Sequence, residues 1–222
     1  MKNKSSTWKS IFLLALGILG LFALRGLRLP SPSALWSPQA PQTRQPFYAT
    51  PGTELTLTRV VGRNHGKRAW EFRAKRITRS LDGLTFMAEE IHEGRIYDGE
   101  KLSCAFKAGQ IRYDVLTQRL TMSGGINGRL SDGTTFTAAL VTADLRQKSL
   151  TIPGPVKVEG KEVNVTADSL TSDLAAETVT LKGNAVVAWS GGTMRAAEVT
   201  YSVKDGTFSV QGNQGEGVDL TL

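Results

Sequence analysis

The sequence predicts an all-β domain of antiparallel strands, and three observations support this fold class. A segment of about 29 residues, first seen at Phe106, occurs four times in succession without gaps. Within each copy apolar and polar residues alternate, a pattern typical of strands with one buried and one solvated face. Glycine is frequent, at 23 of 222 residues, and no segment after residue 52 has a helical period.

The repeat has conserved spacing between four kinds of residue. Each copy opens on an apolar residue, at Phe106, Phe136, Val165 and Met194. Alanine follows two positions later, at Ala108, Ala138, Ala167 and Ala196. A polar residue comes before a short turn, at Asp114, Asp144, Asp173 and, as a departure, Ser202. Each copy ends on glycine, at Gly124, Gly154, Gly183 and Gly212. A fifth, weaker copy of the first part of the repeat occurs at Phe72, Ala74 and Ile77.

Each copy is therefore predicted to be one β-hairpin. The aspartates are expected to accept backbone hydrogen bonds in the turns, and the terminal glycines to allow a bulge or bend. The glycine pairs in Ser123-Gly124-Gly125 and Ser190-Gly191-Gly192 are also expected at turns. Two architectures remain open: a solenoid of stacked hairpins, or two antiparallel sheets folded over an apolar trough.

The chain before the β-domain divides into two segments. Residues 1–29 contain an uninterrupted run of fourteen uncharged residues, from Ile11 to Leu24. Three lysines precede this run, and Arg25 and Arg28 follow it. We expect an uncleaved, single-pass transmembrane helix with its amino terminus in the cytoplasm, and a cleaved signal peptide is the alternative. Residues 30–52 hold six of the eight prolines and are predicted to be a linker. Residues 53–222 are predicted to form the exported β-domain.

Composition excludes several function classes. The net charge is +7, but the first 52 residues account for six of these charges, so nucleic-acid binding is not expected of the folded domain. One cysteine, Cys104, permits no internal disulfide, and two histidines are too few for a histidine-rich metal site. No nucleophile elbow, phosphate loop or metal-ligand spacing occurs. We therefore predict no catalytic residue, no metal and no cofactor.

A basic group stands out between Arg59 and Arg79. It has eight basic residues and one acid, Glu71. Two interpretations remain open: attraction to anionic headgroups or an acidic partner, or an ordinary solvated strand face.

The chain resembles the LptC family of the lipopolysaccharide-export machinery and its LptA/OstA-type relatives. The resemblance rests on the apolar leader, on Gly66-Lys67 followed by Trp70, Phe72, Ala74 and Ile77, on the turn at residues 96–101, and on the repeated units. It implies a β-taco or β-jellyroll domain in the periplasm, held at the inner membrane by one helix. It also implies that the protein receives lipopolysaccharide from an ATP-driven extractor with LptB/F/G-type subunits and passes it to an LptA-type bridge protein.

Two sets of residues are predicted to carry this function. Acyl chains are expected to contact apolar residues in the trough: Phe106, Ile111, Leu120, Met122, Phe136, Val141, Ile152, Leu170 and Leu181. Edge strands are expected to pair with partner proteins through Leu55 and Val61 at the front of the domain and Val218, Leu220 and Leu222 at its end. The alternative function is an exported β-solenoid, structural or adhesive, with no lipid cargo.

Overall fold

The computed structural model describes residues 54–64, 67–98, 100–161, 163–173, 175–202, 204–212 and 219–221. These residues form antiparallel β-strands joined by turns, which confirms the all-β antiparallel fold class. The described residues include no helix long and apolar enough to cross a membrane. The transmembrane helix and the linker that the sequence predicts lie outside the described residues.

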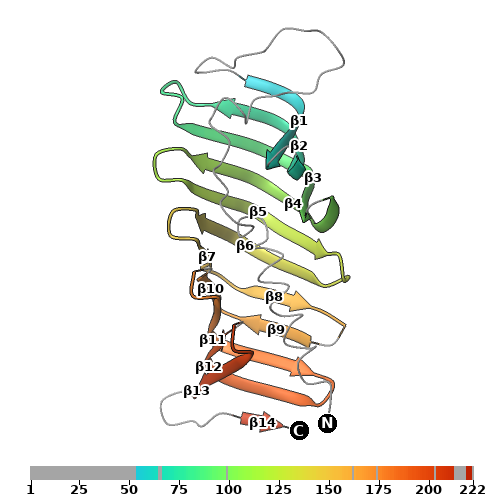
Figure 1. The fold of residues 1–222 in the computed structure, drawn as a ribbon, viewed down its shortest axis with the longest axis vertical. Helices are drawn as coiled ribbons and strands as arrows, with labels where there is room; N and C mark the ends of the chain where they lie inside the picture. The colour runs from blue at the N-terminus through green and yellow to red at the C-terminus, as the bar shows by residue number, and fades with distance from the viewer. Residues whose placement is uncertain are drawn as a thin grey trace.

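The strands follow one another with short connections (Figure 1). In chain order they are β1 (Glu54–Asn64), β2 (Lys67–Arg79), β3 (Thr85–Asp98), β4 (Lys101–Asp114), β5 (Arg119–Leu130), β6 (Thr135–Asp144), β7 (Ser149–Ile152), β8 (Val156–Glu159), β9 (Val163–Ala167), β10 (Ser169–Asp173), β11 (Thr178–Trp189), β12 (Gly192–Ser202), β13 (Thr207–Gln211) and β14 (Asp219–Thr221).

The strand pairing divides the sheet lengthwise into two halves. The long strand β6 pairs with β7 through one part and with β8 through another, and β11 pairs in the same way with β10 and β9. β12 likewise pairs with both β13 and β14. We call the half that contains β7, β10 and β13 half-sheet A, and the half that contains β8, β9 and β14 half-sheet B. The strands β2 to β5 contribute to both halves, with a register shift between the two parts. Figure 1 shows β7 and β10 on one side and β8 and β9 on the other.

The repeated glycine marks the place where a strand passes between the halves. Gly124 in β5 and Gly183 in β11 have φ angles of 82° and 71°, in the left-handed region that favours glycine. Both lie at register shifts, and Gly154 lies in the break between β7 and β8. The predicted bulge or bend is therefore confirmed. The expectation that Ser123-Gly124-Gly125 forms a turn is wrong, because these residues lie in a bulge inside β5.

The aspartate column forms the turns, as the sequence predicts. Asp114 accepts a hydrogen bond from the Thr117 amide at 2.8 Å, and Asp144 accepts one from the Gln147 amide at 2.9 Å. Asp173 accepts two such bonds, from the amides of residues 175 and 176. In the fourth copy Ser202 donates a hydrogen bond to Asp205 at 2.8 Å. Each hairpin of the repeat thus closes through a side chain at the same position.

One apolar core joins the two half-sheets. Inward-facing residues of both halves, such as Ile152 in β7 and Val158 in β8, belong to the same cluster and are almost fully buried. The alanine column lies in this cluster next to the bend, where small side chains allow the two layers to approach. Of the two open architectures, the structure is therefore the folded-over one, built from stacked hairpins.

Candidate functional site

A continuous row of apolar side chains runs through half-sheet A from one end of the sheet to the other. Its members are directly paired on adjacent strands, except that the step from Val141 to Ile152 continues the register of the pairs Thr142–Thr151 and Ala143–Leu150 by one residue. Its members are Leu55, Ile77, Ala88, Ile111, Met122, Val141, Ile152, Leu170, Leu181, Val199 and Val210. At about 4.8 Å between neighbouring strands, this row is about 50 Å long. We call it the interior row.

A second row lies nearer the turns of half-sheet A and is more mixed. Leu120 pairs with Tyr113 on one side and with Ala143 on the other. Farther along, the row includes Ser172, which is buried and donates a hydrogen bond to the Thr178 carbonyl at 3.0 Å. The second row therefore places a few polar atoms at the margin of an apolar interior.

Half-sheet B contributes phenylalanine rings that lie over glycines. Phe106 pairs with Gly94 on one side and with Gly128 on the other, and Gly128 pairs in turn with Phe136. A Cβ atom on Gly94 would lie 2.3 Å from the Phe106 ring, and one on Gly128 would lie 2.0 Å from the Phe136 ring. The absence of a side chain at each glycine therefore makes the slot in which the ring packs.

The structure brings the nine predicted lipid-contacting residues into one interior. Eight of them are buried in the core with exposed fractions of 8% or less, and Leu120 is partly buried against it. Six lie in the interior row, Leu120 lies in the second row, and Phe106 and Phe136 lie in half-sheet B. Their shared location is a fact of the structure, and their contact with lipid stays a prediction.

The predicted partner edges lie at the two ends of the strand order. Leu55 and Val61 are on β1, which among the described strands pairs only with β2. Leu220 is on β14, which among the described strands pairs only with β12. Val218 and Leu222 lie outside the described residues. Pairing of these edges with other proteins stays a prediction.

Several members of the basic group form ion pairs with acids on neighbouring strands. Lys75 forms an ion pair with Glu90 at 2.7 Å, Arg76 contacts Glu89, and Arg73 approaches Glu93 at 3.8 Å. The sequence count missed these acids because they lie on β3, the next strand. The pairing supports the interpretation of this group as a solvated strand face.

Glu71 is the buried member of this face. It is 3% exposed and accepts hydrogen bonds from Arg59, from Arg95 at 3.2 Å and from the Tyr97 hydroxyl at 2.7 Å. Burial raises the pKa of the Glu71 carboxyl. The hydrogen bonds from Arg59 and Tyr97 and the charges of Arg59 and Arg68 outweigh this effect and lower the pKa to about 2. Three strands are thus joined through one carboxylate, an arrangement that sequence spacing did not indicate.

The remaining candidates from the sequence are the thiol of Cys104 and possible metal ligands. Burial raises the pKa of the Cys104 thiol to about 12, so this thiol is poorly nucleophilic. In the part of the chain that the structure describes, no three His, Cys, Asp or Glu side chains gather as a metal site would require.

Comparisons with known proteins give two findings. A family model described as the LptA/(LptD N-terminal domain) LPS transport protein matches residues 144–207, from the end of β6 to the start of β13. The chain is also similar to the solved structure of LptH, described as the LptA homologous periplasmic component of the conserved lipopolysaccharide transport device from Pseudomonas aeruginosa. That similarity has a TM-score of 0.45 at 16% identity and covers 54% of this chain and 94% of LptH. No curated protein matches the sequence significantly.

Proposed function

We propose that this chain is a periplasmic lipopolysaccharide-binding bridge protein, anchored in the inner membrane by residues 1–29. In this proposal it receives lipopolysaccharide from an ATP-driven extractor of LptB/F/G type and passes it to an LptA-type bridge protein. The match of residues 144–207 to a family of lipopolysaccharide transport proteins supports the class of cargo. The finer assignment to the LptC family rests on the leader and on the motifs around Trp70.

The observation that carries the proposal is the interior row. It offers a lipid chain a continuous apolar surface that crosses every hairpin of the domain. Each methylene group transferred from water to such a surface gains about 0.8 kcal/mol, so an acyl chain prefers the interior to the periplasm. Because the row has no polar member from β1 to β13, a chain that enters between separated half-sheets would cross no polar barrier along it. No chemical step is needed, and a separate ATPase supplies the energy.

Site-specific photo-crosslinking tests this proposal. Photo-reactive residues at Met122, Ile152 and Leu181 are expected to form ATP-dependent crosslinks to lipopolysaccharide in membranes that contain the transport machinery. Thr171 and Lys182 are matched controls, because each is exposed and directly follows an interior residue. Crosslinks to protein alone at the three interior positions would contradict lipid carriage and favour the solenoid without cargo.

The edge strands have a separate test. Deletion of residues 218–222 is expected to abolish capture of the next bridge protein, because it removes the backbone groups of β14 that would pair with an added strand. The domain should stay folded, because β14 pairs with β12 through only three residues. Unchanged capture by a folded deletion variant would refute this role of the C-terminal strand.

A further inference from the structure

Three turns of half-sheet A form a continuous rim. They are residues 80–84, 115–118 and 145–148, which join β2 to β3, β4 to β5 and β6 to β7. The Val115 amide donates to the Leu84 carbonyl at 2.9 Å, and the Leu145 amide donates to the Gln118 carbonyl at 3.1 Å. The Arg146 guanidinium also donates to the Leu116 carbonyl. We call these three turns the turn rim, and their mutual bonds make it one surface.

Two large apolar side chains project from neighbouring turns of this rim. Leu81 is 84% exposed and Leu116 is 60% exposed. A single exposed leucine needs no explanation, because every protein surface has some. Here the two lie on turns that hydrogen-bond to each other, outside the core that holds the other apolar residues of the adjoining strands.

Basic residues lie on the same three turns and on the strand ends that adjoin them. The rim and the strand ends beside it carry Arg79, Arg112, Arg119, Arg146 and Lys148. The three acids in the same region point their carboxylates back into the turns. Asp82 accepts the Leu84 amide, and Asp114 and Asp144 accept turn amides as described above. The acids therefore close the turns, and Asp144 also forms an ion pair with Arg119 at 3.5 Å. With five bases and three acids, two positive charges remain in excess on the rim.

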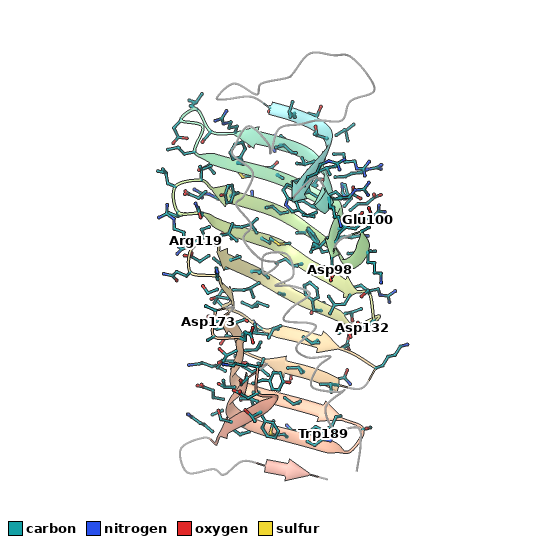
Figure 2. All side chains as sticks on the ribbon, in the orientation of Figure 1. Asp98, Glu100, Arg119, Asp132, Asp173 and Trp189 are labelled. Carbon is teal, nitrogen blue, oxygen red and sulfur yellow. The ribbon has the colours of Figure 1, made fainter. Side chains whose placement is uncertain are left out.

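The charge reverses farther along the same side of the molecule. The next two turns and their flanks carry Asp173, Glu177 and Asp205 with one base, Lys204. Figure 2 shows Arg119 and Asp173 on one side of the sheet, with Asp98, Asp132 and Trp189 on the other. Among the described turns of half-sheet A, exposed leucines together with an excess of bases occur only within the first three.

We propose that the turn rim binds the surface of an anionic lipid bilayer. Leu81 and Leu116 enter the interfacial region of the headgroups, where apolar side chains are favoured. The guanidinium and ammonium groups beside them contact lipid phosphates. Each basic residue near an anionic membrane contributes about fivefold to its association, so the rim makes a weak contact. Such a contact would orient a tethered domain with one side toward the membrane.

The test uses full-length protein reconstituted in vesicles, with an environment-sensitive fluorophore at one introduced cysteine. The labelled variants are Leu81→Cys and Leu116→Cys, and Leu102→Cys is the matched control because it is an exposed leucine on β4, at the end away from the turn rim. Cys104 is buried and does not compete for the label. Vesicles of phosphatidylcholine alone are compared with vesicles containing phosphatidylglycerol.

In the anionic vesicles, labels at 81 and 116 are expected to be quenched several-fold more strongly by spin-labelled lipid, and less by aqueous iodide, than in phosphatidylcholine. The label at 102 should not change. The combined change of Arg112, Arg146 and Lys148 to Gln should abolish the difference, as should about 1 M salt, which reduces the screening length to about 3 Å. Equal quenching in both lipids, or an equal response at 102, would overturn the proposal.

Discussion

The slot that Gly128 makes for the Phe136 ring can be tested by adding one methyl group. In Gly128→Ala the new Cβ atom would lie 2.0 and 2.1 Å from two ring carbons of Phe136, whereas ordinary contacts begin near 3.4 Å. The ring cannot move away freely, because Phe136 is 5% exposed and packed in the core. Overpacking of this kind costs about 1–3 kcal/mol. We expect a loss near the upper end, because the ring and the glycine face each other on paired strands.

A double-mutant cycle separates this clash from a general intolerance of alanine at the position. Phe136→Leu alone leaves a cavity and is expected to destabilise the domain by about 1–2 kcal/mol. In the double variant the smaller side chain makes room for the new methyl group. The double variant should therefore be more stable than the two single losses predict, by about 1 kcal/mol or more.

The assay is urea unfolding of the full-length protein in detergent, followed by circular dichroism of the β-domain. Gly154→Ala is the control, because a Cβ atom there would meet nothing within 4 Å and the residue does not have a positive φ angle. It should leave the midpoint nearly unchanged. Additive losses in the cycle, or a Gly128→Ala variant as stable as Gly154→Ala, would refute the slot.

Three further predictions concern the turns and the buried carboxylate. Lys148 has a φ angle of 52°, so Lys148→Gly should raise the free energy of unfolding by about 1 kcal/mol, whereas Lys157→Gly in β8 should lower it. Asp144→Ala should lower the free energy of unfolding by about 1 kcal/mol in the same assay, because it removes two hydrogen bonds from backbone amides. A chelator should not change the urea midpoint, because the carboxylate closes the turn and holds no metal ion. The folded-state pKa of Glu71 is depressed, so its stabilisation is present above about pH 4.5 and is lost as the pH falls toward 2. Glu71→Gln should remove about 1–3 kcal/mol at neutral pH and flatten the acid limb of the stability profile; an unchanged limb would contradict this role.

The repeat made much of this fold predictable. Residues in the same column occupy the same place across the folded sheet, so Phe72, Phe106 and Phe136 lie in one row of half-sheet B. Even the faint copy at Phe72, Ala74 and Ile77 has the register of the others. Period-two alternation fixes which face is buried, and the spacing from aspartate to glycine gives the distance from turn to bend.

The contacts between strands were harder to predict. Gly94 and Gly128 each stand 22 residues after the opening Phe72 and Phe106, but the later copies have Val158 and Val187 at this position. The pairing of the two glycines with Phe106 and Phe136 therefore became visible only with the strand register. The acids that pair with Arg76 and Lys75 were missed for the same reason, because Glu89 and Glu90 are more than ten residues from these partners in sequence. Sequence periodicity reports which face a residue lies on, and the register decides which residue lies beside it.

The packing of the interior bears on how a lipid could enter it. In the middle of the interior row Val141, Ile152 and Leu170 are nearly inaccessible, so these side chains already fill the space between the half-sheets. At both ends the row is more open, since Leu55 on β1 and Val210 on β13 are only partly buried. Under the proposed function, an acyl chain therefore meets apolar surface first at an end strand. It reaches the middle of the interior row only if the half-sheets move apart. The bend is the place where such movement costs least, because the register shifts at Gly124 and Gly183 already interrupt the ladder of hydrogen bonds there.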